Sequence, residues 1–448
     1  MDNAQRTGYT VLTVFFMGVG RMQQTNRIPD EAPERAVLVG LDTGEFDAEA
    51  SLDELAELAR TAGAEVLGRL VQKREAPDKA TALGSGRLEE LAAVCEGDDI
   101  DLVLFDGELT ATQQRNLSDA LPCRVVDRTA LILDIFAARA RSAEGRLQVE
   151  LAQLQYLLPR LAGQGTALSR LGGGIGTRGP GETKLESDRR HIRRRIHALK
   201  EQLREVEGRR DQRRARRKKE GVQTVAIVGY TNAGKSTLLN RLTDAGVLAE
   251  DKLFATLDPT ARALRLPDGR QVLLIDTVGF VRRLPHQLVE AFRSTLEEAV
   301  EADVLLNLCD ASSPEAGEHL EVTRRLLEEL GCGDRPVLSV LNKCDAAADP
   351  PAGPFLRISA KTGEGLDELL RAIAAALPPD RRRVKLLFPF SQGALAERCR
   401  REGAVEAEEY TPEGLAMTAT LGVRLLDAAR AYIVEDRAEN RSKGADMQ

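Results

Sequence analysis

Hydrophobic and polar residues alternate along this chain in rhythms that predict short strands and amphipathic helices. Between residues 36 and 141, apolar runs of strand length are separated by stretches whose apolar residues recur every three or four positions. This alternation indicates a small α/β domain. The expected strands are Ala36–Gly40, Glu65–Val71, Asp101–Phe105 and Cys123–Asp127, and the expected helices are Ser51–Ala62, Leu88–Cys95, Thr112–Ala120 and Ala130–Ala140.

Two local signals refine this first domain. Ser51 and Glu54 stand three positions apart, which predicts a capping box at the start of the first helix. The segment Leu83–Leu91 (LGSGRLEEL) is a glycine turn that opens a helix. Such a turn can bind an anion, but no lysine follows it, and a tight strand–helix connection explains the same residues.

The next region carries apolar seams that step by three and four positions. The first seam is Leu147, Leu151, Leu154, Leu158 and Leu161, and the second is Leu185, Ile192, Ile196, Leu199, Leu203 and Val206. Each seam is too short to be stable alone, so the spacing predicts an antiparallel helical hairpin. Residues 162–184 connect the seams and contain eight glycines. A connection this rich in glycine can approach a phosphate-lined surface closely, and a flexible linker is the alternative interpretation.

The second seam is also strongly basic. Leu185–Glu220 carries fifteen Lys or Arg against seven Asp or Glu, a net charge of +8, within a chain whose net charge is −7. This excess of positive charge indicates that the segment binds nucleic acid. The alternative is a helix face that is simply exposed to solvent. No aromatic residues interleave for base stacking, which favours a folded RNA recognised by phosphate and shape. The candidate RNA contacts are Arg170, Arg178, Lys184, Arg189, Arg190 and Arg193.

The most specific motif follows this basic segment. Gly229–Ser236 (GYTNAGKS) matches G-x-x-x-x-G-K-[ST] between an expected strand, Thr224–Val228, and an expected helix, Thr237–Leu242. Glycines let the backbone wrap around phosphate oxygens, and the helix N-terminus offers N–H groups. We therefore expect Lys235 to reach the β- and γ-phosphates, and the Ser236 hydroxyl to bind Mg²⁺.

The base is indicated by NKCD, Asn342–Asp345, at the end of the apolar run PVLSVL. A carboxylate there can accept hydrogen bonds from guanine N1–H and N2–H₂, a donor pair that adenine lacks, so Asp345 is the expected guanine reader. Asn342 is expected to orient the loop and the base, with the stem of Lys343 along the ring. In isolation Asn and Asp after a strand also explain a simple turn, but the P-loop upstream supports a guanine site.

Two further segments complete a nucleotide site. DTVG, Asp276–Gly279, ends the strand QVLLI. Asp276 is expected to hold Mg²⁺ through water, and the Gly279 N–H to contact the γ-phosphate. SAK, Ser359–Lys361, is expected to turn backbone N–H groups toward guanine O6. Helical patterns at Gln287–Val300, Pro314–Leu330 and Gly365–Leu377 alternate with these strands and predict a parallel sheet.

Two positions bear on catalysis. A switch segment needs a threonine that completes the Mg²⁺ shell, and both Thr256 and Thr260 qualify. Phe280 stands directly after DTVG, where many GTPases carry a glutamine that orients the attacking water. A phenyl ring cannot do this, so we expect slow intrinsic hydrolysis that depends on a partner.

Composition limits the remaining possibilities. The six cysteines are scattered without a C-x-x-C pair and the four histidines have no ligand spacing, which argues against a zinc site or a disulfide framework and suits a reducing cytoplasm. The apolar run Val11–Val19 is too short to span a bilayer, so no integral membrane insertion is expected. It resembles the apolar region of a signal peptide, but only Arg6 precedes it and no clean small-x-small cleavage site follows, so secretion is not expected. Residues 1–34 are expected to be a disordered extension, with Met22 as an alternative start.

These motifs together resemble the HflX family of GTPases, over about residues 35 to 435. The resemblance rests on GGGIGTRGPGETKLESDRR (Gly172–Arg190), the P-loop, LFATLDPT (Leu253–Thr260), DTVGF, NKCD and SAK. It implies that Thr256 is the switch threonine, that Ser236 and Thr256 bind Mg²⁺, and that the catalytic set is Lys235, Thr256 and Gly279. It also implies binding of GTP and GDP, and of rRNA in the large (50S) ribosomal subunit, with a role in splitting or rescuing stalled ribosomes under stress.

The expected fold class is α/β: a doubly wound P-loop GTPase sheet, an N-terminal α/β domain with an antiparallel helical hairpin, and a small C-terminal α+β domain. The expected divisions are 1–34 (extension), 35–141 (N-terminal domain), 142–221 (basic hairpin), 222–380 (GTPase domain), 381–436 (C-terminal domain) and 437–448 (tail). The expected nucleotide contacts are Gly229, Tyr230, Thr231, Asn232, Ala233, Gly234, Lys235, Ser236, Thr237, Phe254, Ala255, Thr256, Leu257, Asp258, Asp276, Thr277, Val278, Gly279, Asn342, Lys343, Cys344, Asp345, Ser359, Ala360 and Lys361.

The leading hypothesis is thus a cytoplasmic, monomeric, ribosome-associated GTPase. The alternative is a GTP-gated regulator that binds another RNA or protein and hydrolyses GTP only incidentally. An RNA-dependent ATPase is disfavoured by Asp345, because that carboxylate suits guanine.

Overall fold

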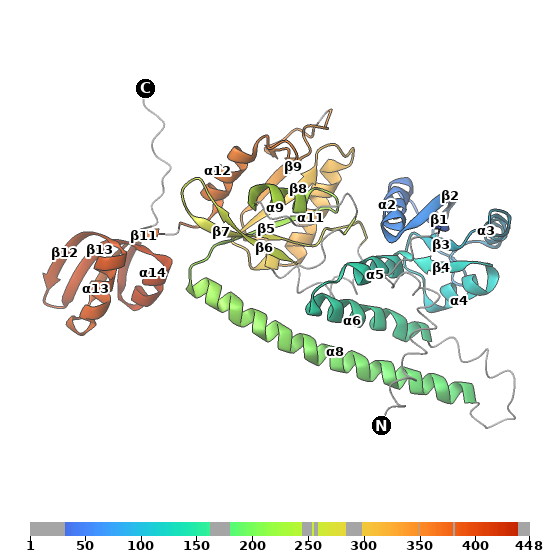
Figure 1. Ribbon diagram of the computed structural model, residues 1–448, viewed down its shortest axis with the longest axis horizontal. Coiled ribbons are helices and arrows are strands. Elements are labelled where there is room, and N and C mark those ends of the chain that lie inside the picture. Colours follow the sequence, from blue (N-terminus) through green and yellow to red (C-terminus); the bar gives the residue numbers. More distant parts are fainter. Residues whose placement is uncertain are drawn as a thin grey trace.

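The computed structural model describes residues 32–161, 180–243, 253–254, 259–283, 298–348, 350–379 and 381–437. Within these residues the chain forms three sheets in succession, and a long helix connects the first part to the second (Figure 1). The expected α/β fold class is confirmed by this arrangement.

The first sheet has the strand order β2-β1-β3-β4, and all its neighbouring strands are parallel. Its strands are β1 (Glu34–Asp42), β2 (Ala64–Lys73), β3 (Leu102–Phe105) and β4 (Arg124–Asp127), and its helices are α2 (Ala48–Ala62), α3 (Ser85–Gly97), α4 (Ala111–Ala120) and α5 (Arg128–Arg139). Successive side chains of a strand point to opposite faces. Leu38 and Leu104 therefore pack with α2 and α5, whereas Val39 and Val103 pack with α3 and α4.

The predicted capping box at Ser51 is wrong. The helix α2 begins three residues earlier, because Asp47 caps it and accepts hydrogen bonds from the N–H groups of Glu49 (3.0 Å) and Ala50 (3.1 Å). Ser51 lies inside the helix on its buried face. The glycine turn before α3 is a connection, since the Gly84 N–H donates to Gln72 Oε1 at 2.9 Å.

The helical hairpin consists of α6 (Ala143–Arg160) and α8 (Pro180–Lys219). Ion pairs of Glu150 with Arg195 and of Glu144 with Arg210 fix an antiparallel register. Most residues of the two predicted seams meet in one apolar cluster, which Leu157 joins: Leu147, Leu151, Leu154, Leu157, Leu158, Leu161, Ile192, Ile196, Leu199 and Leu203. Val206 lies outside this cluster, and the side chain of Leu185 lies outside the described residues.

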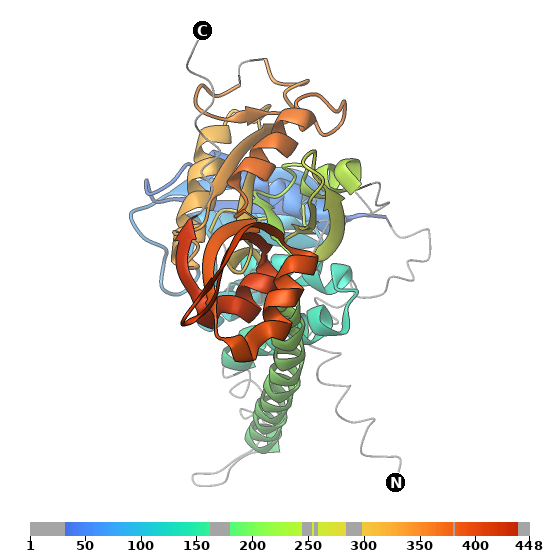
Figure 2. The same ribbon diagram turned by 90° about the vertical axis from the view of Figure 1, so that its left-hand side faces the viewer.

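The helix α8 begins at Pro180, so the connection between the helices is shorter than the expected 162–184. Proline suits this position because its fixed φ matches the first helical turn and its missing N–H costs nothing there. At 1.5 Å per residue, the 40 residues of α8 extend about 60 Å. Figures 1 and 2 show α8 running beneath the central sheet and past the first domain.

The central sheet has the order β10-β9-β8-β5-β7-β6 and is parallel except for β6, which pairs antiparallel with β7. Its strands are β5 (Thr224–Gly229), β6 (Thr260–Arg265), β7 (Gln271–Asp276), β8 (Val304–Asp310), β9 (Val337–Asn342) and β10 (Leu356–Arg357). Its helices are α9 (Lys235–Thr243), α11 (Ala316–Glu329) and α12 (Leu366–Ala376). Most of the helix expected at Gln287–Val300 lies outside the described residues.

Helices cover both faces of the central sheet. Val225 and Ile227 of β5 pack with α9 and α12, while Ala226 and Val228 pack with α11. This two-sided burial explains why β5 reads as a continuous apolar run. The strand ends that carry the P-loop, DTVG and NKCD therefore meet at one edge of the sheet, where ligands bind in open α/β sheets.

The third sheet is antiparallel, with the order β12-β13-β11-β14. Its elements are β11 (Arg381–Phe388), η3 (Phe390–Gln392), α13 (Gly393–Glu402), β12 (Ala404–Thr411), β13 (Gly414–Gly422), α14 (Val423–Ala429), η4 (Arg430–Tyr432) and β14 (Ile433–Arg437). Thus β1 and β14 each extend one residue into the ranges expected as extension and tail. Within the described residues, no helix has the length and apolar character that a membrane span requires.

Candidate nucleotide site

The P-loop, Gly229–Ser236, connects β5 to α9 through a backbone that requires glycine at two positions. Gly229 has φ +146° and Gly234 has φ +91°. A Cβ at Gly229 would collide with the carbonyl of Leu308, and one at Gly234 would collide with the side-chain amide of Asn342. The loop is therefore wrapped closely against the neighbouring strands, as a phosphate-binding loop must be.

Lys235 is buried at the start of α9. Its Nζ donates hydrogen bonds to the carbonyls of Gly229 (3.2 Å) and Tyr230 (2.8 Å). Burial lowers the pKa of Lys235 to about 8, although Asp276 acts to raise it. A buried ammonium of this kind is stabilised by an anionic partner, and a nucleotide phosphate supplies one.

Of the residues predicted to surround Mg²⁺, Ser236 and Asp276 lie together, while Thr256 lies outside the described residues. Ser236 Oγ donates to Asp276 Oδ2 at 2.7 Å, which places a hydroxyl oxygen beside a buried carboxylate. Oxygen donors of this type suit Mg²⁺, so the residues present fit that ion. Thr277, an expected nucleotide contact, instead directs its hydroxyl to the carbonyl of Ile227 at 2.7 Å.

The segment Asp276–Phe280, which we call switch II, touches the P-loop through its backbone. The Phe280 N–H donates to the Gly229 carbonyl at 3.1 Å, and the Thr231 N–H donates to the Phe280 carbonyl at 2.7 Å. A Cβ at Gly279 would lie 2.7 Å from Thr231 Cγ2 and 2.8 Å from Lys235 Nζ. Only glycine allows this approach.

The ring of Phe280 is buried, at 1 % exposure, in a cluster that includes Val228, Leu305 and Leu327. It packs in the core beneath α11 and cannot orient a water molecule. The absence of a water-orienting side chain at this position therefore has a packing reason.

The guanine segment is built around Asn342, whose side chain is buried. Its Nδ2 donates to the Ala233 carbonyl at 2.8 Å, and its Oδ1 accepts from the Ala360 N–H at 2.9 Å. Asn342 thus ties the P-loop to the SAK segment. The ammonium of Lys343 pairs with Asp310 at 2.8 Å, while the Asp345 side chain is exposed at the strand end.

The expectation for SAK needs a correction. The Ala360 N–H is used by Asn342, and the Ser359 N–H donates to the Glu364 carbonyl at 3.0 Å. Neither N–H group is turned toward a base, because both close the loop itself. The predicted contact of this segment with guanine O6 stays a prediction.

Phe254 is also placed differently from the sequence prediction. Its ring is buried against Phe136 of α5, with ring centroids 4.5 Å apart, so it does not line the nucleotide site. The expected switch residues Ala255, Thr256, Leu257 and Asp258 lie outside the described residues. The alternative threonine, Thr260, is the first residue of β6.

The predicted RNA contacts fall into two groups. Arg170 and Arg178 lie outside the described residues, as does the side chain of Lys184. On α8, Arg190 and Arg193 are exposed and Arg189 is half-buried. The neighbouring Arg194 is equally exposed and was missed, although it continues the same basic run.

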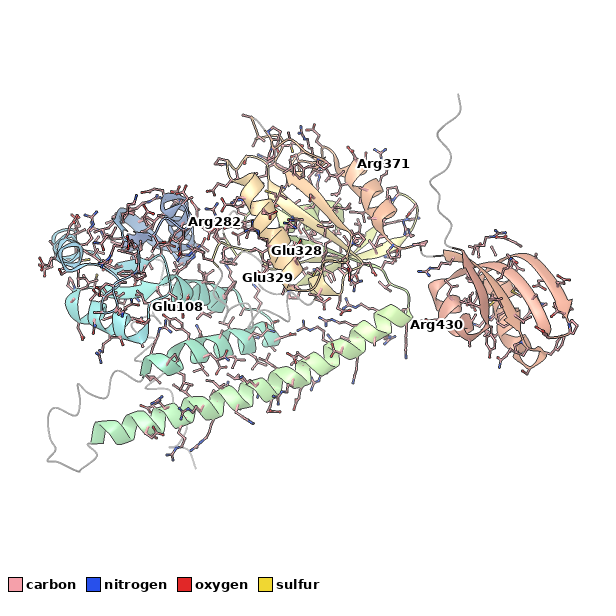
Figure 3. All side chains as sticks on the ribbon, turned by 180° about the vertical axis from the view of Figure 1, so that it is seen from behind. Glu108, Arg282, Glu328, Glu329, Arg371 and Arg430 are labelled. Carbon is pink, nitrogen blue, oxygen red and sulfur yellow. The ribbon has the colours of Figure 1, made fainter. Side chains whose placement is uncertain are left out.

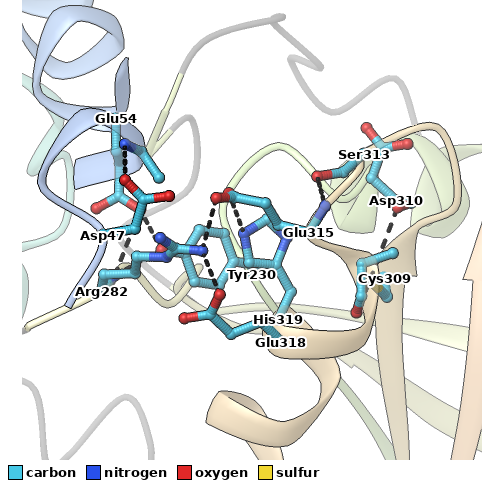
Figure 4. Close-up of polar contacts among 12 residues, drawn as sticks. Asp47, Glu54, Tyr230, Arg282, Cys309, Asp310, Ser313, Glu315, Glu318 and His319 are labelled. Atoms are coloured by element: carbon cyan, nitrogen blue, oxygen red, sulfur yellow. Dashed lines mark hydrogen bonds and ion pairs between the residues drawn. The ribbon is translucent and has the colours of Figure 1, made fainter. Parts of the chain in front are cut away.

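Sequence reasoning also missed the residues that connect this site to the N-terminal domain. Arg282 lies two residues after switch II, and Figure 3 shows it between the two domains. It lies in a polar cluster with Glu54 and Tyr230, drawn in Figure 4. No local pattern marks these residues, since Glu54 comes from a helix 176 positions before Tyr230.

Three family models match the chain: GTP-binding GTPase N-terminal at residues 49–137, GTP-binding GTPase Middle Region at residues 139–217, and 50S ribosome-binding GTPase at residues 224–343. A solved GTP-binding protein from Sulfolobus solfataricus in complex with GDP is 25% identical, with 77% of this chain and 98% of that chain covered and a TM-score of 0.41.

Full-length relatives are more similar. The GTPase HflX of Caldanaerobacter subterraneus subsp. tengcongensis is 51% identical over 432 residues, which cover 96% of this chain and 100% of that protein. The GTPase HflX of Escherichia coli (strain K12) is 44% identical over 396 residues, which cover 86% and 92%. With its P-loop, switch II and guanine motif assembled at one sheet edge, this chain belongs to the HflX family of GTPases and is a GTP-hydrolysing enzyme.

Proposed function

We propose that this GTPase binds the large (50S) ribosomal subunit through the tip of the α6–α8 hairpin, and that it acts in splitting or rescuing stalled ribosomes under stress. The observation that carries the proposal is the position of exposed arginines on α8. The ion pairs of Arg195 and Arg210 face α6, whereas Arg190, Arg193 and Arg194 face solvent near the start of α8. Exposed guanidinium groups of one sign favour a phosphate-lined partner.

The GTP chemistry follows from the residues of the site. Lys235 neutralises charge on the β- and γ-phosphates, and the Gly279 N–H contacts the γ-phosphate. Ser236 would bind Mg²⁺ directly, and so would Thr256 by family resemblance. Asp276 would contact the ion through water. Bound Mg²⁺ stabilises negative charge on the phosphates during in-line attack by water. The exposed carboxylate of Asp345 selects guanine, as the catalysed reaction requires.

The partner must supply what the site lacks. Phe280 offers no group that can position the attacking water, and supplying missing groups in trans is worth roughly 10³–10⁵ in rate for other GTPases. We take the protein to act as a cytoplasmic monomer whose GTP-bound form docks on rRNA. Docking would then complete the catalytic site and end in hydrolysis and release.

Cosedimentation with purified 50S subunits tests this proposal. Binding should be stronger with a non-hydrolysable GTP analogue than with GDP. Replacing Arg190, Arg193 and Arg194 by Gln should weaken binding. Replacing Arg209, Arg213 and Lys219 by Gln removes the same charge from the far end of α8 and should weaken binding less. Equal losses would show that only overall charge matters.

Salt dependence gives a second readout. Removing one interaction between an arginine and a phosphate should lower the slope of log affinity against log salt by about 0.7 to 0.9. The proposal would be contradicted if the protein failed to sediment with 50S subunits in both nucleotide states. It would favour a GTP-gated regulator of another RNA or protein, with incidental hydrolysis.

A further inference from the structure

Residues from both switch regions of the GTPase site dock on the N-terminal domain through apolar side chains. Leu253 and Phe254, which precede the expected switch threonine, and Val278 and Val281, within and just after switch II, are all buried in the core cluster formed by α2, α5 and α6. Phe254 sits edge-to-face on Phe136 of α5 and has a left-handed φ of +54°. Such a φ is unfavourable for a bulky residue, so the interface holds it there.

A buried polar cluster links the same elements. The Tyr230 hydroxyl of the P-loop donates to Glu54 of α2, whose side chain is 10% exposed. The same hydroxyl accepts the backbone N–H of Arg282 at 2.6 Å. One phenol therefore joins the P-loop, the backbone of Arg282 just beyond switch II, and the N-terminal domain (Figure 4).

The protonation of this junction agrees with its hydrogen bonds. Burial and the neighbouring Glu54 both raise the pKa of Tyr230, so the phenol keeps its proton and can donate. Burial raises the pKa of Glu54 as well, while Arg128 and Tyr230 act to lower it. Glu54 also accepts a hydrogen bond from Arg128 Nη2.

A second connection runs parallel to the first. Arg128 pairs with Asp106 at 2.7 Å, and Asp106 also pairs with Arg283 at 3.2 Å. Arg128 Nη2 donates to the Arg282 carbonyl at 3.3 Å. Arg282 and Arg283, two and three residues after switch II, are thus both held by carboxylates or guanidinium groups of the N-terminal domain.

The position held by these contacts is one in which switch II lies against the P-loop. The Phe280 carbonyl takes the Thr231 N–H, and Gly279 is packed against Thr231 and Lys235. A γ-phosphate that contacts both the Gly279 N–H and Lys235 needs these two groups to separate. Movement of switch II in response strains the hydrogen bond between Arg282 and Tyr230, because Arg282 is three residues beyond Gly279.

We propose that Tyr230 and Arg282 are positioning residues that tie the P-loop and switch II to the N-terminal domain through Glu54, and that this tie favours the GDP-bound over the GTP-bound state. The inference rests on the GTP switch of the proposed function. It adds the residues through which the N-terminal domain responds to the bound nucleotide. GTP binding loosens the tie, and the N-terminal domain with its hairpin is released in response.

The test measures dissociation constants of fluorescent GDP and of a fluorescent non-hydrolysable GTP analogue for the full-length protein without ribosomes. In Tyr230→Phe and in Glu54→Gln, the affinity for the GTP analogue relative to GDP should rise about tenfold, within the usual range for coupled sites. Glu57→Gln removes a carboxylate from the exposed side of the same helix and should leave this ratio unchanged.

A ratio that is unchanged or falls in both variants overturns the proposal, and so does an equal weakening of both nucleotides, which a merely structural loss would produce. The double variant should change the ratio by less than the product of the two single changes, because both substitutions alter the shared hydrogen bond between Tyr230 and Glu54. Additive changes would contradict this. If Glu54→Gln unfolds, because Arg128 loses a buried partner, Tyr230→Phe decides the question. These measurements need no ribosome, so their failure is separable from failure to bind 50S subunits.

Discussion

At the scale of single residues, Asp345 carries the nucleotide choice. It is exposed at the end of β9, beside Asn342, which is held by the P-loop and the SAK segment. Replacing Asp345 by Asn removes an acceptor for guanine N1–H and should shift preference from GTP toward xanthosine triphosphate by at least about tenfold, since unpaired polar groups at a binding site are costly.

Competition of both triphosphates for binding measures this shift. Asp367→Asn makes the same chemical change at an exposed carboxylate in the first turn of α12 and should leave selectivity intact. Unaltered guanine preference in Asp345→Asn would show that another residue reads the base.

His319 adds a pH dependence at the same scale. It stacks on Tyr230 with ring centroids 3.9 Å apart, and burial together with Arg282 lowers its pKa to about 4. The carboxylates of Glu318 and Asp310 act to raise this pKa without overcoming the burial. The unfolded imidazole titrates near 6.5, so between pH 6.5 and 4 the unfolded chain binds more protons.

The stability of the folded protein should therefore fall as the pH is lowered from about 6.5, and level off near 4. The contribution of His319 to this loss is about 2 kcal/mol at about pH 5. Denaturant unfolding on either side of this window measures it, and His319→Gln should flatten the dependence. His197→Gln, on the exposed side of α8, is the control and should not. Equal pH slopes in all three proteins would contradict the assignment to His319.

At the scale of elements, the hairpin of α6 and α8 depends on one narrow seam. Leu199 is fully buried in it, while Val206, at the end of the expected seam, is only half-buried and lies outside the cluster. Leu199→Ala should cost about 2–5 kcal/mol, because a large buried side chain is removed and the cavity cannot close fully.

Hydrogen exchange of the α6 and α8 amides measures this local destabilisation. Val206→Ala should change the exchange much less, since the side chain is already partly solvated. If Leu199→Ala leaves exchange of both helices unchanged, the hairpin is held by its ion pairs rather than by the seam.

At the scale of the whole molecule, hydrolysis should depend on the partner. The Phe280 ring is part of the core, so Phe280→Ala would leave a cavity and lower the free energy of unfolding by about 3–5 kcal/mol. A loss of activity in this variant could then come from unfolding rather than from catalysis. The cleaner experiment leaves the chain intact and measures GTP turnover with and without 50S subunits.

Turnover should be slow alone and rise by orders of magnitude with 50S subunits, while 30S subunits serve as the control. Shortening the glycine-rich connection, residues 165–178, should abolish the stimulation without changing basal turnover. Fast turnover of the isolated protein would show that the site already contains its water-orienting group.

Much of this molecule is determined by local spacing along the sequence. The P-loop, DTVG and NKCD each depend on a few adjacent residues at a strand end, and the parallel sheet then brings these ends together. The seams of the hairpin are equally local, since Leu151 and Leu199 follow from a repeat of three and four.

Only the tertiary structure decided where the side chains between these motifs point. Glu54 looks like part of a helix cap in the sequence but reaches Tyr230, and Phe254 looks like a nucleotide contact but packs on Phe136. Such choices depend on contacts between segments more than a hundred residues apart. No local repeat encodes them, because burial is set by the surface that the other domain brings.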